Sequence, residues 1–238
     1  MSDPALQLLL IGHGRMGRLV AALAGEYGMQ VAGIVTRSNS QDVDRWPRAD
    51  VAIDFSIGEA VPMTLPVLAA RAMDIVVGTT GWQAHEAAMR AETARRNVGV
   101  VAAPNFAVGV NLFVALVERA AGLMAPHPEF GAYIHELHHA AKRDAPSGTA
   151  LALRAALEQG GYHHRVDVAS TRAGSIPGTH TVGFDAPAET ITLTHTARDR
   201  TAFARGALEA ARWVHGRRGW FTMRDVLGIE SLIPDPSS

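Results

Sequence analysis

The amino-terminal part of the chain alternates between short apolar runs and stretches of helical length. The apolar runs are continuous rather than alternating, which is typical of parallel strands buried on both faces. They cover Leu8–Ile11, Val31–Val35, Val51–Phe55, Ile75–Val77 and Val98–Ala102, and helices are predicted near 16–27, 59–72 and 83–96. The pattern predicts an α/β fold with a Rossmann-like, doubly wound parallel sheet.

The pattern changes after about residue 108. Helices are predicted at 111–124, 149–159 and 201–215, and strands at 133–137, 166–171, 179–185 and 189–197. The last strand alternates with period two, which indicates an open antiparallel face. We therefore expect a dinucleotide-binding domain of residues 1–108 and 216–238. The second domain, residues 109–215, is expected to be α+β with an open, mainly antiparallel sheet, and to serve substrate binding and oligomerisation.

Composition narrows the possible functions. The net charge is -1 at pH 7 and cysteine is absent, so neither nucleic-acid binding, disulfides nor a thiolate metal site is expected. No apolar run reaches the ~18 residues of a membrane span. We expect a cytoplasmic protein without a metal site and without membrane contact.

A glycine-rich turn follows the first predicted strand and opens the first helix. Its sequence, Gly12-His13-Gly14-Arg15-Met16-Gly17, matches G-x-G-x-x-G. In this context the glycines permit a tight turn, and the helix start offers free N–H groups to a pyrophosphate. The alternative is a glycine-rich turn without a ligand.

The end of the second strand bears on cofactor choice. A site specific for NAD usually carries a carboxylate about 20 residues downstream of the glycine turn, but here the sequence is Thr36-Arg37-Ser38. Arg37 suits a 2′-phosphate, or it is a solvated loop cation. We expect NADPH and/or NADH as the cofactor. Two further loops, Gly78-Thr79-Thr80 and Ala103-Pro104-Asn105-Phe106, follow strands and either line the nicotinamide half or are ordinary turns.

Lys142 is the only lysine, beside 21 arginines. Arginine stays protonated at accessible pH, whereas the pKa of a lysine can be tuned for proton transfer. Lys142 is either a chance surface residue or a position that needs an amine.

The segment around Lys142 permits two interpretations. His135-Glu136-Leu137-His138-His139 matches the zinc-protease pattern H-E-x-x-H, which needs both histidines on one helix face. The surrounding residues instead favour a strand leading into a loop. As part of a reductase, Ser147, Gly148 and Thr149 open a helix whose free N–H groups form a carboxylate cradle. His138, His139 and Lys142 then supply protons and positive charge.

The same segment resembles the signature of the 4-hydroxy-tetrahydrodipicolinate (dihydrodipicolinate) reductase family. The signature is His138-His139-x-x-Lys142-x-Asp144-Ala145-Pro146-Ser147-Gly148-Thr149-Ala150. Further matches are Gly12 to Gly17, Asp54-Phe55-Ser56, Gly78 to Gly81, Ala103 to Asn111, Arg172-x-Gly174-x-x-x-Gly178-x-His180, Thr194-His195-x-Ala197, Phe203-Ala204-x-Gly206-Ala207 and Met223-x-Asp225-Val226-Leu227.

The resemblance implies a role for each matching residue. His138 is implied as the acid/base residue, Lys142 as the proton donor, and His139, Gly148 and Thr149 as holders of a substrate carboxylate. Cofactor contacts are implied on Gly12–Gly17, Gly78–Thr80 and Ala103–Phe106. A small dicarboxylate substrate and a homotetramer are implied as well. Two departures, a short glycine loop and Thr36 in place of an acid, leave the cofactor preference open.

Two other functions are compatible with a nucleotide-binding first domain. An amino- or keto-acid dehydrogenase, for example one that resembles aspartate dehydrogenase, would share this domain but does not need the segment 138–150. A nucleotide-sensing regulator would bind the cofactor without turnover, and it leaves the His-His-Lys cluster unexplained.

Overall fold

The computed structural model describes residues 4–229, which form two compact units. The first unit contains the chain up to residue 108 and again from residue 200, and the second contains residues 109–199. None of the helices formed by residues 4–229 combines the length and the apolar character that a membrane span requires.

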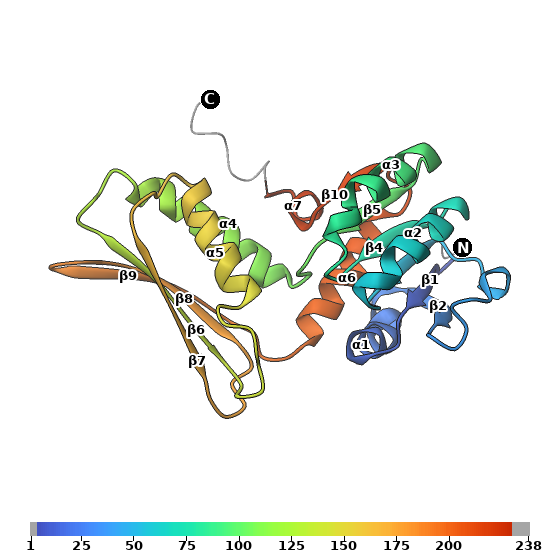
Figure 1. The fold of residues 1–238 in the computed structure, drawn as a ribbon, viewed down its shortest axis with the longest axis horizontal. Helices are drawn as coiled ribbons and strands as arrows, with labels where there is room; N and C mark the ends of the chain where they lie inside the picture. Colours follow the sequence, from blue (N-terminus) through green and yellow to red (C-terminus); the bar gives the residue numbers. More distant parts are fainter. Residues whose placement is uncertain (1–3, 230–238) are drawn as a thin grey trace. The chain divides into compact units, whose positions relative to one another are not determined.

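The first unit is built on one parallel sheet with helices on both faces (Figure 1). Its strand order is β10-β5-β4-β3-β1-β2, and every neighbouring pair is parallel. The strands are β1 (Leu6–Ile11), β2 (Met29–Val35), β3 (Val51–Asp54), β4 (Asp74–Val77), β5 (Gly99–Ala102) and β10 (Gly219–Phe221). The helices are α1 (Arg15–Leu23), α2 (Val61–Ala70), α3 (Glu86–Arg96), α6 (Thr201–Val214) and α7 (Met223–Val226).

The continuous apolar strands are explained by burial on two sides. In β1, Leu8 and Leu10 join the core formed with α1 and α6, whereas Leu9 and Ile11 join the core formed with α2 and α3. Each such side chain contributes roughly 1.5–3 kcal/mol when it is fully buried. The predicted α/β class with a doubly wound parallel sheet is confirmed.

The helix α6 corrects one predicted boundary. We expected the second domain to extend to residue 215, but α6 belongs to the first unit. Its buried residues, among them Ala204, Ala207 and Leu208, join the core that also contains residues of α1. A Cβ added to Gly206 would lie 1.7 Å from the carbonyl oxygen of Phe106, so this helix approaches the main chain too closely for a larger residue.

The second unit is a four-stranded mixed sheet in the order β7-β6-β8-β9. The β6–β7 pair is parallel, and the β6–β8 and β8–β9 pairs are antiparallel. The strands are β6 (Gly131–His138), β7 (Val166–Arg172), β8 (Thr179–Ala186) and β9 (Glu189–Thr196), and the helices are α4 (Val108–Met124) and α5 (Gly148–Gln159).

Both helices of the second unit pack on the same face of its sheet (Figure 1). Ile134 of β6 and Phe184 of β8 are buried against α4 and α5. On the opposite face, Thr181 and Thr194 pair through their hydroxyl groups across β8 and β9 while Thr194 stays exposed. The expected open, mainly antiparallel sheet is therefore confirmed.

Candidate functional site

Four loops that were expected to hold the cofactor leave the carboxyl ends of the parallel strands. Gly12 follows β1, Arg37 comes after β2, Gly78 follows β4 and Ala103 follows β5. Because the strands all run in the same direction, these loops share one edge of the sheet. The strand order reverses between β1 and β3, and open α/β sheets bind their ligands at such a switch point.

The three glycines of the first turn have three different environments. Gly12 has φ +93°, and a Cβ there would lie 2.4 Å from the carbonyl oxygen of Phe55. A Cβ on Gly17 would lie 2.2 Å from the carbonyl oxygen of Gly12, whereas Gly14 has no heavy atom within 4 Å of that position. These environments fit a tight turn, close helix packing and open access for a pyrophosphate, respectively.

The first turn of α1 is suited to an anion. Gly14 is its N-cap, and no side chain caps the helix. The free N–H groups of a helix start carry partial positive charge and bind phosphates. His13 and Arg15 are exposed beside it, while Met16 packs partly against the core. The residues present therefore fit a dinucleotide.

The loop after β4 turns one of its two threonines inward. Thr79 is 7% exposed, and its hydroxyl group donates to Asp54 Oδ1 at 2.8 Å. Its carbonyl oxygen accepts the indole N–H of Trp82 at 2.7 Å. Thr80 is exposed, and a Cβ on Gly78 would overlap the Phe55 ring. This loop offers Thr80 and its main chain, rather than the Thr79 side chain, to a ligand.

Part of the loop after β5 is buried in the core of the first unit. Phe106 is 1% exposed and meets Phe55 edge-on, with ring centroids 6.1 Å apart. Pro104 is exposed, and Asn105 accepts the N–H of Ala107 at 2.9 Å through Oδ1. A cofactor contact by Phe106 would therefore have to come from its main chain.

Asp54 is a buried carboxyl group at the end of β3. Its contacts could not be predicted from the sequence. Its Oδ1 accepts the N–H and the hydroxyl of Ser56 and the hydroxyl of Thr79, and its Oδ2 faces the Thr64 hydroxyl at 3.3 Å. Burial raises the pKa of Asp54, although these hydrogen bonds oppose the rise. Through these hydrogen bonds, the Asp54 carboxyl group links the loop after β3 to the loop after β4.

Arg37 lies in a stable turn after β2. The side chain of Asn39 accepts the Thr36 N–H at 2.6 Å and donates to the Ile34 carbonyl at 3.1 Å. The hydroxyl groups of Thr36 and Ser38 lie 2.8 Å apart. Arg37 itself is exposed. The segment Thr36-Arg37-Ser38 thus presents two hydroxyl groups and a guanidinium group. It contains no carboxylate.

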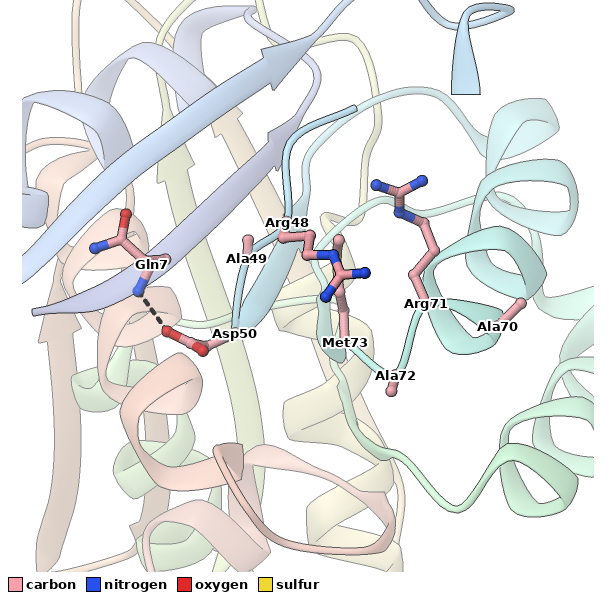
Figure 2. Close-up of a pocket in the computed structure, with 8 residues that line it drawn as sticks. All are labelled: Gln7, Arg48, Ala49, Asp50, Ala70, Arg71, Ala72 and Met73. Carbon is pink, nitrogen blue, oxygen red and sulfur yellow. Dashed lines mark hydrogen bonds between the residues drawn. The ribbon is translucent and has the colours of Figure 1, made fainter. Parts of the chain in front are cut away.

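A cavity of about 690 Å³ lies at the other end of the parallel strands (Figure 2). Gln7 stands near the start of β1, while Asp50 and Met73 precede β3 and β4. Arg71 lines the cavity, but its guanidinium group donates to two main-chain carbonyl groups. The other cation in the lining is Arg48, two residues before Asp50 in the sequence. This cavity is at the amino ends of the strands, away from the switch point.

The strand β6 places its residues alternately on two faces. Ala132, Ile134, Glu136 and His138 are buried, whereas His135 lies on the other face. The H-E-x-x-H pattern therefore forms a strand rather than the helix that the zinc-protease interpretation needs.

Glu136 is fully buried and accepts three hydrogen bonds through one oxygen. Its Oε1 accepts the Ser147 N–H at 2.9 Å, the Ser170 hydroxyl at 2.6 Å and Arg172 Nη2 at 2.7 Å. Burial would raise the pKa of Glu136, but hydrogen bonds from these three residues outweigh it and lower the pKa to about 2. The side chain is a carboxylate at neutral pH.

Two buried imidazoles lie beside Glu136. Its Oε2 is 3.1 Å from His138 Nδ1 and 3.7 Å from His180 Nε2, and the two rings meet edge-on with centroids 5.0 Å apart. Burial lowers the pKa of His138, while the charge of Glu136 opposes the shift. Burial, together with His138, lowers the pKa of His180 to about 4. Both rings are therefore mainly neutral at pH 7.

Glu136, His138 and His180 are also residue types that bind metals, with donor atoms within 4.8 Å of one another. The guanidinium group of Arg172 already pairs with this carboxylate, and its charge opposes a second cation. The absence of a metal site stays a prediction.

Lys142 pairs with a carboxylate in the loop after β6. Its Nζ lies 2.7 Å from both oxygens of Asp144, and its side chain is 23% exposed. The hydrogen bond from Lys142 lowers the pKa of Asp144. Arg172 donates to the Asp144 carbonyl at 2.6 Å, and the Lys142 N–H donates to the carbonyl of His139. The ammonium group is thus held near the end of β6.

The helix α5 begins at the end of this loop. Ser147 is its N-cap and accepts the Ala150 N–H at 3.2 Å. Gly148 is exposed with open space around its Cβ position, and Thr149 is half-buried. One strand, one loop and one helix start therefore bring together His138, His139, Lys142, Ser147, Gly148 and Thr149.

Comparison with known families covers both units. Residues 6–106 match a model described as "Dihydrodipicolinate reductase, N-terminus", and residues 109–227 match one described as "Dihydrodipicolinate reductase, C-terminus". The chain belongs to the dihydrodipicolinate reductase family.

Relatives of this family match nearly the whole chain. A 4-hydroxy-tetrahydrodipicolinate reductase of Laribacter hongkongensis is 38% identical, covering 96% of this chain and all of the relative. One from Stenotrophomonas maltophilia strain K279a is 41% identical, covering 95% and 100%. A dipicolinate-bound dihydrodipicolinate reductase from Paenisporosarcina sp. TG-14 has the same fold, with a TM-score of 0.74 at 19% identity, covering 91% of this chain and 97% of that one.

The sequence alone assigns Glu136, Arg172 and His180 no role in a member of the dihydrodipicolinate reductase family. The signal was the alternation in β6, which puts Glu136 on the same face as Ile134 and His138. A carboxylate on a buried face needs charged or hydrogen-bonding partners, and Arg172 and His180 on the neighbouring strands are such partners.

Proposed function

We propose that this protein uses NAD(P)H to reduce 4-hydroxy-tetrahydrodipicolinate, by way of dihydrodipicolinate, to tetrahydrodipicolinate in the diaminopimelate route to lysine. The family membership over both units supports this proposal. The observation that carries it is the segment from His138 to Thr149. This segment combines an imidazole, an ammonium group and an open helix start within one strand, loop and helix.

In the proposed reaction the second unit binds a dicarboxylate. The N–H groups of Gly148 and Thr149 and the positive end of the α5 dipole bind one carboxylate, and His139 adds a further donor. His138 is mainly neutral before binding, since burial lowers its pKa. A dianion beside this ring favours its protonated form.

Proton transfer falls to two side chains. Water leaves the hydroxylated ring, and a nicotinamide, when bound, would supply the hydride that reduces the resulting conjugated imine. Lys142 donates a proton as negative charge develops toward the ring nitrogen, and His138 acts as the acid/base residue. Such general acid catalysis is typically worth ~10²–10⁴ in rate. Asp144 pairs with the ammonium group through both carboxylate oxygens and holds it in place.

For the cofactor we propose use of both NADPH and NADH. The uncapped start of α1 and the open space at Gly14 suit the pyrophosphate. The exposed Arg37 with the flanking hydroxyl groups suits a 2′-phosphate. The segment Thr36-Arg37-Ser38 contains no carboxylate that would repel this phosphate.

We also propose a homotetramer that assembles through the open face of the mixed sheet. Threonine hydroxyl pairs across β8 and β9, and half-buried side chains of β6 and β8, cover this face in place of helices. Light scattering of the purified protein should give four times the 25.3 kDa chain mass. A monomer at micromolar concentration would contradict the assembly without affecting the reaction.

The decisive experiment measures steady-state rates with enzymatically generated 4-hydroxy-tetrahydrodipicolinate. We expect turnover with NADPH and with NADH, and none when aspartate replaces the intermediate. Turnover of aspartate with NAD(P)⁺ would instead support an amino-acid dehydrogenase. Binding of the cofactor without turnover of either compound would favour a regulator.

Lys142 provides the residue-level test. Lys142→Ala should lower kcat by ~10²–10⁴ while NADPH binding, followed by fluorescence titration, stays unchanged. Lys142→Arg keeps the charge but cannot transfer a proton, so it should be nearly as slow. A wild-type kcat in either variant would remove Lys142 from the mechanism.

A further inference from the structure

The proposed reaction leaves the most deeply buried charge of the second unit without a role. Glu136 is 0% exposed, yet its Oε1 alone accepts three donors. Its other oxygen, Oε2, has no hydrogen-bond partner in the described part of the chain, and neither has His138 Nδ1. These two buried atoms lie 3.1 Å apart.

We propose that Glu136 is a positioning residue that holds His138 with its proton on Nδ1, so that Nε2 remains available for proton transfer. The inference rests on the proposed function, in which His138 is the acid/base residue. The distance of 3.1 Å permits a hydrogen bond from Nδ1 once the ring turns to align its N–H with Oε2, and leaving both atoms unpaired in a buried site would be costly.

Three contacts keep Glu136 in the required orientation. Ser170 and Arg172 come from the parallel neighbour β7, and the Ser147 N–H comes from the start of α5. With Oε1 held by these donors, Oε2 has to point toward the imidazole rings. One carboxylate thus aligns the end of β6 with the helix start that is proposed to bind the substrate.

The other ring nitrogen of His138 lies near a glycine. A Cβ added to Gly178 would be 3.2 Å from His138 Nε2, and Gly178 has φ +133°. A side chain at position 178 would therefore crowd the nitrogen that the proposal assigns to proton transfer. Glycine at position 178 therefore leaves the space beside Nε2 free of a side chain.

The charged groups around His138 determine how removal of the Glu136 carboxylate changes the protonation of this imidazole. The charged and titratable groups around it are Glu136 on its own strand, Lys142 and Asp144 in the following loop, Arg172 on β7 and His180 on β8. Glu136 and Asp144 favour the imidazolium ion, whereas Lys142 and Arg172 oppose it. Loss of the Glu136 charge leaves only Asp144 favouring protonation, against burial and two cations.

The variant Glu136→Gln tests the proposal with little change in shape. Its amide oxygen can keep the three hydrogen bonds of Oε1, while its NH₂ group faces His138 Nδ1 as a donor. This reverses the tautomer, because Nδ1 must then accept and the proton moves to Nε2. We expect kcat to fall by roughly 10- to 10⁴-fold, since changing a group that orients a metal-bound imidazole costs about 10- to 100-fold and reversing the tautomer in a catalytic triad costs about 10⁴. The His138 limb of the kcat/KM profile should move to lower pH.

Nitrogen-15 NMR of the imidazole groups gives a readout that a merely structural role would not move. His138→Gln identifies the His138 signals by their loss. We expect the proton on Nδ1 in the wild-type protein and on Nε2 in Glu136→Gln. A wild-type His138 with its proton on Nε2 would overturn the proposal, and this measurement applies even if Glu136→Gln fails to fold.

Asp74→Asn is the matched control. Asp74 is a 4% exposed carboxyl group in the first unit that accepts the N–H groups of Gly99 and Gly216 and a contact from Arg218. Its loss should reduce stability but leave kcat and the pH profile close to wild type. An equal fall in kcat for this control and Glu136→Gln would reduce the Glu136 effect to general destabilisation and overturn the proposal.

Failure of this inference and failure of the proposed function are distinguishable. If the wild-type protein does not turn over the intermediate, the proposed function is wrong, whatever the tautomer is. If the wild type turns over and Glu136→Gln keeps kcat within about twofold with an unmoved pH limb, only the positioning role is wrong.

Discussion

In the first unit, the loops at the edge of the parallel sheet offer mainly backbone groups and small residues. In the second unit, the end of β6 and the loop after it offer ionisable side chains whose charges are paired. Two of the buried carboxyl groups, Asp54 and Glu136, show the same contrast. Asp54 receives donors from hydroxyl and main-chain groups, and burial raises its pKa. Glu136 also receives the guanidinium group of Arg172, and its pKa falls to about 2.

The difference shows what strong donors add to a buried acid. The hydrogen bonds to Asp54 do not offset its burial, whereas those from Ser147, Ser170 and Arg172 do so for Glu136. The second unit therefore holds a permanent charge beside a histidine. Four tests, taken from the largest expected effect to the smallest, examine this contrast.

Gly12→Ala should have the largest effect, and it should act on the first unit. The new Cβ would meet the carbonyl oxygen of Phe55 at 2.4 Å in a backbone with φ +93°. Strain and overlap together should cost roughly 3 kcal/mol or more, measured as loss of unfolding free energy and of NADPH affinity. Gly28→Ala is the control, since Gly28 has φ +66° but open space. Equal losses in both variants would show that overlap at Gly12 contributes nothing.

Acid should then weaken the second unit through Glu136. The folded pKa lies below the ordinary value of 4.5, so the stabilisation is present above 4.5 and is lost as the pH falls through about 2. The difference corresponds to about 3 kcal/mol. Urea unfolding across this range should show this loss in the wild type and not in Glu136→Gln. Asp54 should behave oppositely: its raised pKa means that its contribution is lost as the pH rises.

A smaller effect is expected from the two helix caps. Ser147→Ala removes the cap of α5 and the contact of the hydroxyl group with His180 Nε2 at 3.1 Å, and should cost about 2 kcal/mol. Thr222→Ala removes the exposed capping box with Asp225 in the first unit and should cost about 1 kcal/mol or less. Thermal unfolding of both variants measures the two losses of stability. A larger loss in Thr222→Ala than in Ser147→Ala would contradict the contrast.

Arg37→Ala should have the smallest effect. The side chain is exposed, so an ion pair with a 2′-phosphate is worth about 1 kcal/mol or less. We expect the KM for NADPH to rise about threefold to fivefold and the KM for NADH to stay unchanged. Equal changes in both values would mean that Arg37 does not contact the phosphate.

The parts of the fold with strong local signals could be predicted from the sequence. Continuous apolar runs predicted β1 to β5, and the glycine turn predicted the start of α1. The strand β10 was missed because Gly219–Phe221 is too short to carry a period. The helix α6 was predicted but assigned to the wrong unit. Chain order alone does not decide which core the helix joins.

The candidate site divides in the same way. Residues 138–149 are contiguous, so their spacing could be interpreted from the sequence alone. Glu136, Ser170 and Arg172 are far apart in the sequence and meet only because β6 and β7 pair in parallel register. The inward turn of Thr79 depends on Asp54, 25 residues away in the sequence. Side-chain direction in a loop follows from such distant partners.

The division of the chain also sets an order for folding during synthesis. The second unit is continuous in sequence, residues 109–199, whereas the first needs the later segment from residue 200 onward. Ala204, Ala207 and Leu208 complete the core beneath β1 and β3, and they leave the ribosome after the whole second unit. Because domains fold as units while the chain emerges, the mixed sheet can close first. The nucleotide fold, although it begins at the amino terminus, is completed last.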